Sequence, residues 1–188
     1  MAAAGDRLFV AVLPPPAVVE SWESFLEPRR DAEPGFRWTL AGGWHVTCAF
    51  MASVPPQLSE PLEEALADVA ARTTSFGIAV SGGGAFPDPD HARALWLGVV
   101  EGVEPLGRLA RRCRNAAAGC GIAVDGARFR PHLTIARSGP TRARRWLTVL
   151  DAVPGAAWTV EEFVLLRSRL LPGGAGYETV GRYRLSPG

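Results

Sequence analysis

The sequence predicts an α+β protein with antiparallel-rich sheets and helices packed outside them. Segments typical of strands alternate along the chain with segments whose apolar residues recur at helical spacing. The order helix, strand with a His-x-Thr pattern, helix, strand, strand occurs in both halves of the chain, although few identities connect the halves elsewhere. At 188 residues, of which 47% are hydrophobic, the chain is long enough to bury a core.

The N-terminal half begins with a strand that ends at Pro14, because three consecutive prolines cannot donate ladder hydrogen bonds. In the helix that follows, Val18, Trp22 and Phe25 lie on one face. The expected elements are a strand over 7–13, a helix over 17–27, a strand over 44–50, a helix over 58–72 and strands over 76–80 and 94–100. We expect the Gly- and Pro-rich segment 81–93 to be the loop between the last two strands.

The C-terminal half repeats this order with a helix over 106–117, a strand over 129–137, a short helix over 143–150 and strands over 158–166 and 177–185. One face of its first helix is apolar, and the other carries Arg108, Arg111, Arg112 and Arg114. A solvated face explains these arginines most simply, and contact with RNA is the alternative. His91 lies in the Pro- and Asp-rich loop, where we expect it to be exposed.

Composition excludes several classes of protein. A formal net charge of +1 argues against a uniformly basic nucleic-acid-binding surface, although it leaves room for a local basic groove. No apolar run approaches the roughly 18 residues that a membrane-spanning helix needs. The N-terminal run LFVAVL is ended by prolines and resembles a first strand more than a signal peptide. We expect a cytoplasmic protein without a membrane anchor, and a monomer.

Cysteine and lysine usage narrows the chemistry further. Three cysteines without a CxxC spacing argue against a disulfide framework and against a cysteine-based zinc site. All 20 basic residues are arginines. Without lysine, the chain can form no Walker A loop, no Schiff base and no lysyl-nucleotide intermediate.

The His-x-Thr pattern is the strongest functional signal in the sequence. In WHVTCAF, His45 and Thr47 lie on one face of the expected strand, and in FRPHLTIAR, His132 and Thr134 do the same. A single histidine on a core strand is usually a packing residue. Here two of the three histidines in the chain share one frame, which indicates a function.

Two histidines that face one cleft can perform general acid–base catalysis, because imidazole titrates near neutral pH. Transfer at phosphorus suits such a pair, since both the attacking and the leaving oxygen require proton transfer. The threonine hydroxyls can bind nonbridging phosphate oxygens. Arg130 has the strand parity of His132 and is the expected phosphate anchor, whereas Arg137 has the opposite parity and is the weaker candidate.

We expect no metal and no cofactor at this site. A metal site built from His45, His132 and a carboxylate is the alternative, but no acid lies at ligand spacing from either histidine. The glycines of SGGGAF do not follow a strand into a helix with dinucleotide-binding spacing, so a dinucleotide cofactor is not indicated either.

The chain resembles the 2H phosphoesterase superfamily in HVTC and HLTI, in the loop GGGAFPDPDHARALWLGV and in the tail LLRSRLLPGGAGYETVGRYRL. More narrowly, it resembles the bacterial and archaeal RNA 2′,3′-cyclic phosphodiesterases, also called 2′-5′ RNA ligases. The resemblance implies a single domain over 1–188, made of two intertwined, pseudo-symmetric, ferredoxin-like lobes with antiparallel sheets around a central cleft. Each lobe would supply one motif, His45–Cys48 and His132–Ile135.

The resemblance also implies a reaction, the metal-independent hydrolysis of a terminal 2′,3′-cyclic phosphate on RNA to a 2′-phosphomonoester. By that similarity His45 would donate a proton to the departing 3′ oxygen, and His132 would accept one from water. The residue patterns alone do not distinguish these two roles. Cys48 departs from the aliphatic residue more common in the family, but we expect it on the face away from the cleft.

Other functions remain open. The substrate can be a small cyclic nucleotide or an ADP-ribose cyclic phosphate instead of an RNA end. Because there is no lysine for a nucleotidyl intermediate, ligation would require the reversal of phosphodiester transfer into a 2′-5′ linkage. A non-catalytic RNA-binding module is a further alternative, although the sequence contains no RNP-type aromatic motif.

Overall fold

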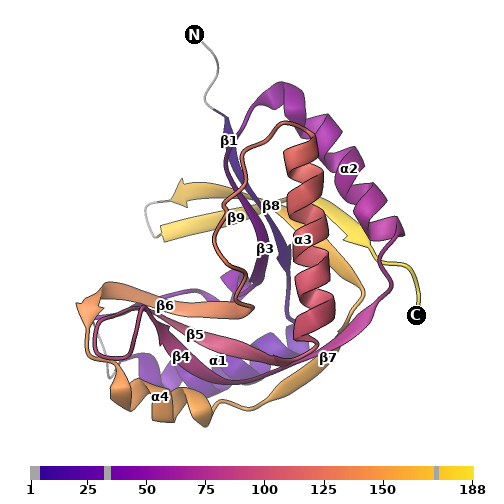
Figure 1. Cartoon of the computed structure of the whole chain (residues 1–188). Coiled ribbons are helices and arrows are strands. Elements are labelled where there is room, and N and C mark those ends of the chain that lie inside the picture. Colours follow the sequence, from indigo (N-terminus) through magenta and orange to yellow (C-terminus); the bar gives the residue numbers. More distant parts are fainter. Residues whose placement is uncertain (1–4, 32–34, 172–173) are drawn as a thin grey trace.

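The computed structural model describes residues 5–31, 35–171 and 174–188, which form a curved sheet flanked by helices (Figure 1). The helices are α1 (Pro16–Arg30), α2 (Ser59–Ala71), α3 (Val103–Gly119) and α4 (Arg144–Asp151). The strands are β1 (Asp6–Val12), β2 (Arg37–Trp38), β3 (Val46–Val54), β4 (Phe76–Phe86), β5 (Ala92–Glu101), β6 (His132–Thr141), β7 (Ala156–Val160), β8 (Glu162–Leu171) and β9 (Gly174–Arg184). Single turns of 3₁₀ helix at Ala41–Gly43 and Pro56–Leu58 precede β3 and α2.

The strands form one sheet in the order β7-β4-β5-β6-β3-β1-β8-β9, with β2 paired to β6. The pairings between these strands are antiparallel. We call β3, β1, β8 and β9 the first half-sheet, and β6, β5, β4 and β7 the second. The halves join where β3 pairs with β6, at Val46 and Leu133. In Figure 1, β1 and β3 run upright, whereas β4, β5 and β6 lie across the lower part.

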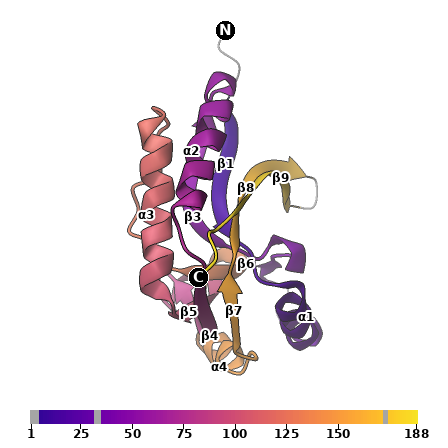
Figure 2. The ribbon, with the colours of Figure 1, turned by 90° about the vertical axis from the view of Figure 1, so that its right-hand side faces the viewer.

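Two helices accompany each half-sheet. In the first, α3 packs against β3, and α2 packs against α3 and β9 (Figure 2). In the second, α4 packs against β4, and α1 reaches β7 through Trp22, whose ring contacts that of Trp158. Each pair combines one helix from the N-terminal part of the chain with one from the C-terminal part. We infer that the half-sheets with their helices are the two intertwined lobes expected from the sequence.

Apolar side chains lie on both faces of the first half-sheet. Along β1, Leu8 and Val10 belong to the large core under the helices, whereas Phe9 and Ala11 point to the opposite face. A small cluster on that opposite face consists of Phe9, Ala11, Val164 and Leu166. The face of the first half-sheet opposite the helices therefore carries a cluster of apolar side chains, and the two motifs lie beside this cluster.

The structure confirms the predicted fold class and the antiparallel strand arrangement, with differences of detail. The sheet is continuous across the two halves. Residues 81–86, expected in a loop, continue β4, and the strand expected over 158–166 is two strands separated at Glu161. At Glu161 the chain leaves the second half-sheet, where β7 pairs with β4, for the first, where β8 pairs with β1. Apolar periodicity does not record a change of partner strand, so this break could not be predicted from the local pattern.

Trp96 of β5 explains why β4 contains glycines. A Cβ atom at Gly84 would lie 2.3 Å from the Trp96 ring, and a Cβ atom at Gly83 would lie 2.5 Å from the Trp96 carbonyl oxygen. Glycine therefore allows β4 and β5 to approach closely at this point. The absence of a side chain at these glycines leaves room for the Trp96 indole. The centroid of the Trp96 ring lies 6.1 Å from that of His132.

Candidate active site

The two motifs lie at equivalent places, each at the start of a strand beside the junction of the half-sheets. His45 directly precedes β3, and His132 is the first residue of β6. The second residues of the two motifs pair in antiparallel register. This register places His45 beside Thr134 and Thr47 beside His132. The motifs are therefore related by an approximate two-fold axis through the junction.

A cavity of about 390 Å³ opens on the face that carries both motifs. Its lining includes both histidines, both threonines, Arg7 and Arg137. No Asp or Glu is among the described residues that line the cavity, so the lining offers these two arginines no carboxylate. A cavity with this lining attracts anions.

Each motif strand contains a β-bulge at the fourth position of its motif. In β3, Thr47 and Ala49 pair with consecutive residues of β1, which leaves Cys48 as the extra residue. In β6, Thr134 and Ala136 pair with consecutive residues of β5, which leaves Ile135 as the extra residue. An extra residue shifts the alternation of faces by one position beyond the bulge.

The bulges change which side chains reach the cavity. Beyond them, Phe50 and Arg137 line it, each five residues after its motif histidine. The parity argument from the sequence, which pointed Arg137 away from the cleft, is therefore wrong. Ile135 and Ala136 are both buried, as expected where a strand carries one extra residue.

Arg130 lies outside the regular strand on which its expected orientation depended, because β6 begins at His132. Its side chain is exposed, and its guanidinium carbon lies 5.8 Å from the centroid of the Phe86 ring. It is not among the described residues that line the cavity. Its carbonyl oxygen, however, accepts a hydrogen bond from Nδ1 of His132. The binding of substrate by the Arg130 side chain stays a prediction.

Backbone carbonyls orient both imidazoles in the same way. Nδ1 of His45 lies 2.7 Å from the Gly43 oxygen, and Nδ1 of His132 lies 2.6 Å from the Arg130 oxygen. A carbonyl can only accept, so Nδ1 carries the hydrogen in both rings. Nε2 of each histidine is then the nitrogen available for proton exchange in the cavity.

Aromatic rings flank both histidines. The centroid of the His45 ring lies 4.8 Å from that of Phe9 and 5.3 Å from that of Tyr177. The centroid of the His132 ring lies 4.9 Å from that of Phe86 and 6.1 Å from that of Trp96. These contacts limit the rotation of both imidazoles.

The surroundings lower the pKa of both histidines below the ordinary value of 6.5. For His45, burial is the largest cause; the hydrogen bond to Gly43 opposes it, and the positive charges of His132 and Arg137 add to it. For His132, burial again comes first, opposed by the bond to Arg130 and reinforced by Arg137. Arg137 thus acts on both members of the pair, and both are neutral in the unliganded protein near pH 7.

Cys48 lies on the face away from the cavity, as predicted. It is fully buried, and burial raises the pKa of its thiol to about 12. Its carbonyl oxygen accepts a hydrogen bond of 3.1 Å from Nε of Arg114 on α3.

On the same helix, Arg112 donates to the Arg72 carbonyl and to the Thr73 hydroxyl. Two of the four arginines on this helix therefore bind neighbouring segments, which corrects the expectation of a purely solvated face.

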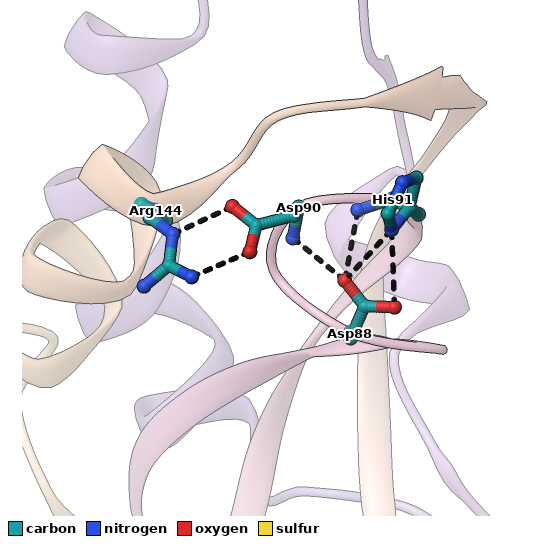
Figure 3. Close-up of polar contacts among 4 residues, drawn as sticks. All are labelled: Asp88, Asp90, His91 and Arg144. Carbon is teal, nitrogen blue, oxygen red and sulfur yellow. Dashed lines mark hydrogen bonds and ion pairs between the residues drawn. The ribbon is translucent and has the colours of Figure 1, made fainter.

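The third histidine is exposed and lies apart from the cavity. His91 pairs with Asp88 in the connection between β4 and β5 (Figure 3). In the same connection, Asp90 accepts two hydrogen bonds from the guanidinium of Arg144 on α4. These contacts attach the connection to α4.

Sequence reasoning missed several residues that line the cavity, among them Arg7, Phe9, Phe50 and Tyr177. Arg7 and Phe9 share a face of β1 and line the cavity, so their common parity was an available signal. Tyr177 lies on β9, whose pairing partner cannot be deduced from local pattern.

No group of three or more His, Cys, Asp or Glu residues is placed to hold a metal within the part of the chain described. In that same part, no helix is both long and apolar enough to cross a bilayer.

A paired His-x-Thr site at the centre of a curved antiparallel sheet defines the class of 2H phosphoesterases. Residues 14–170 match the family model of the 2′-5′ RNA ligase superfamily, and the chain belongs to this family.

Several curated relatives carry the name RNA 2′,3′-cyclic phosphodiesterase. That of Geobacillus stearothermophilus is 35% identical over 150 residues, which cover 79% of this chain and 47% of the relative. That of Methanothermobacter thermautotrophicus is 30% identical over 145 residues, which cover 75% of this chain and 78% of the relative. The chain thus spans about half the length of the Geobacillus relative and more of the archaeal one.

Solved structures share the fold. LigT of E. coli, crystallised with 3′-AMP, superposes with a TM-score of 0.80 at 24% identity, covering 97% of this chain and 99% of LigT. TT0787 of Thermus thermophilus superposes with a TM-score of 0.76 at 24% identity, covering 95% and 97%.

Proposed function

We propose that this protein hydrolyses the terminal 2′,3′-cyclic phosphate of RNA to a 2′-phosphomonoester, with His45 and His132 as a general acid–base pair and without a metal. The observation that carries the proposal is the convergence on one cavity of both motif histidines, each with Nδ1 bonded to a backbone carbonyl, and Arg137. The names of the relatives support the substrate class. The nucleotide in the LigT crystal supports a nucleotide as the occupant of such a site.

In the proposed reaction, neutral His132 takes a proton from water while the water oxygen attacks phosphorus. The bond from phosphorus to O3′ breaks, and protonated His45 transfers its proton to O3′, so the phosphate stays on O2′. His132 then carries the proton that His45 has lost, and exchange with solvent restores the pair. This assignment of acid and base follows the family resemblance, since the two imidazoles are held by equivalent bonds.

Charge in the cavity changes when substrate binds. The guanidinium of Arg137 and the hydroxyls of Thr47 and Thr134 can bind the nonbridging oxygens, which carry most negative charge in the transition state. The bound anion offsets the positive charge of Arg137. Protonation of one histidine then becomes more favourable than in the empty cavity, where the pKa of both is lowered.

The proposal includes the setting predicted from the sequence, a cytoplasmic monomer that acts on RNA ends. The three cysteines are free thiols, which supports a reducing compartment. Ligation would be the same opening of the cyclic phosphate with a 5′-hydroxyl group in place of water: the bond from phosphorus to O3′ breaks, O3′ takes a proton, and a 2′-5′ phosphodiester is the product.

Phosphorus NMR of a short RNA that ends in a 2′,3′-cyclic phosphate tests the proposal. We expect conversion to the 2′-phosphomonoester at an unchanged rate after exhaustive chelation, because the lining contains two imidazoles but no carboxylate among the residues described. The same RNA with a linear 3′-phosphate is the control and should persist. Formation of a 3′-phosphate, or activity that chelation removes and zinc restores, would contradict the proposed mechanism.

A further inference from the structure

Arg7 is a second cation in the cavity, and it is separate from the reacting centre. It follows the alternation of β1, on which Phe9 and Ala11 also point to the face without helices. Arg7 lies on β1, whereas Arg137 lies on β6, the strand that begins with His132.

The position of Arg7 along β1 gives the direction of this separation. Phe9 contacts His45, with the ring centroids 4.8 Å apart. Arg7 lies two residues further toward the N-terminus, which corresponds to about 7 Å of strand. A substrate whose reacting phosphate lies between the histidines would have to extend along β1 to reach it.

The Arg7 side chain is available for an anion. Its guanidinium carbon lies 4.9 Å from the centroid of the Phe50 ring, so the ring supports the planar group. Within the described residues it forms no ion pair, and the acids Asp6 of β1 and Glu178 of β9 pair with Arg167. Phe50 itself reaches the cavity because of the bulge at Cys48.

We propose that Arg7 binds a second phosphate of the substrate, the one on O5′ of the nucleotide that carries the cyclic phosphate. This inference rests on the proposed function and makes it more specific. A planar, stacked guanidinium can bind a phosphate through two parallel hydrogen bonds. Arg7 thereby selects RNA ends over nucleosides that carry only the cyclic phosphate.

Three substrates separate the contributions: adenosine 2′,3′-cyclic phosphate, its 5′-phosphorylated form, and the dinucleotide ApA with a terminal 2′,3′-cyclic phosphate. We expect the wild-type protein to turn over the last two with a kcat/KM at least about tenfold above the first, the effect of one charge-assisted contact. Arg7→Gln should remove most of this preference, because it should lower kcat/KM for the last two substrates by about tenfold and for the first by a much smaller factor. Arg7→Lys should restore it in part, since lysine keeps the charge but not the planar fork.

The matched control is Arg111→Gln, which removes an exposed arginine from α3 and should change none of the three values. Arg7→Gln should also reduce the salt dependence of kcat/KM for the dinucleotide by about one counterion. Thermal unfolding of each variant shows whether it is folded.

An equal loss by Arg7→Gln on all three substrates would overturn the inference, because Arg7 would then act on the reacting phosphate or on the fold. A preference for the dinucleotide that survives in Arg7→Gln would overturn it too and would assign the preference to contacts with the added nucleoside. Failure of the wild-type protein to hydrolyse any cyclic phosphate would instead refute the proposed function on which the inference rests.

Discussion

The two motif strands are built alike but present different side chains to the cavity. Both place the histidine at the start of the strand, hold Nδ1 on the carbonyl two residues earlier, and contain a bulge at the fourth motif position. Five residues after the histidine, the first strand presents Phe50 and the second presents Arg137. The backbone arrangement of the motif strand is therefore duplicated, whereas the positive charge at this position is present on the second motif strand.

This difference indicates how a symmetric pair of histidines can serve an asymmetric reaction. Burial is the largest cause that lowers the pKa of both imidazoles, and the positive charge of Arg137 adds to it at each, so both respond to the same cation. Phe50 offers no charge and instead supports Arg7. We propose that the reacting phosphate lies on the side of Arg137 and the rest of the nucleotide chain on the side of Phe50.

The largest expected effect on activity comes from the histidines, which the two motif strands have in common. Replacement of His45 or His132 by alanine should lower kcat/KM by about 10²- to 10⁴-fold, the usual contribution of general acid–base catalysis. The double variant should be little worse than the poorer single variant, because both groups act in one transition state. Rate measurements on a cyclic-phosphate RNA check this. Independent, multiplicative losses would show that the two motifs do not act together.

A smaller effect should separate the two strands. Arg137→Gln should lower kcat/KM by about 10²-fold, because a donor to the developing negative charge is lost. Phe50→Leu, the matched change at the equivalent position, should cost less than about tenfold, since only a stacking surface changes. Steady-state kinetics of both variants on one RNA gives the ratio. Equal losses would mean that the two positions are not functionally different.

The smallest effect on catalysis is expected at the bulge residues. Cys48→Ile copies Ile135 into the first motif and should lower the free energy of unfolding by roughly 1–3 kcal/mol through overpacking. Because Cys48 points away from the cavity, kcat/KM should change by less than about twofold. Denaturant unfolding and kinetics measure the two quantities.

In the wild type, the buried Cys48 thiol with its pKa of about 12 should resist alkylation, while the partly exposed Cys120 reacts. Rapid alkylation of Cys48 with loss of activity would reverse the assignment of faces.

Much of this arrangement could be predicted from the sequence. The repeated His-x-Thr frame placed four side chains that now line one cavity, and the helical stripes predicted the four helices. These patterns are local: residues two apart share a strand face, and residues three or four apart share a helix face.

The remainder depends on pairing between strands, which local pattern does not contain. The extra residue Ile135 is visible only in the register between β5 and β6, so strand parity favoured Arg130 over Arg137. The change of half-sheet at Glu161 and the arrival of Tyr177 beside His45 depend likewise on which strands become neighbours. For Arg130, the parity argument was applied to a residue that precedes the strand.

The pH dependence of kcat/KM in Arg137→Gln tests most directly the claim that both histidines respond to one cation. Because the charge of Arg137 lowers both pKa values, its removal should raise both and move the whole bell-shaped profile to higher pH than in the wild type. Arg137→Lys keeps the charge, so its profile should stay near that of the wild type even though the rate falls. A profile of Arg137→Gln in which neither limb moves, or in which both move to lower pH, would contradict the account.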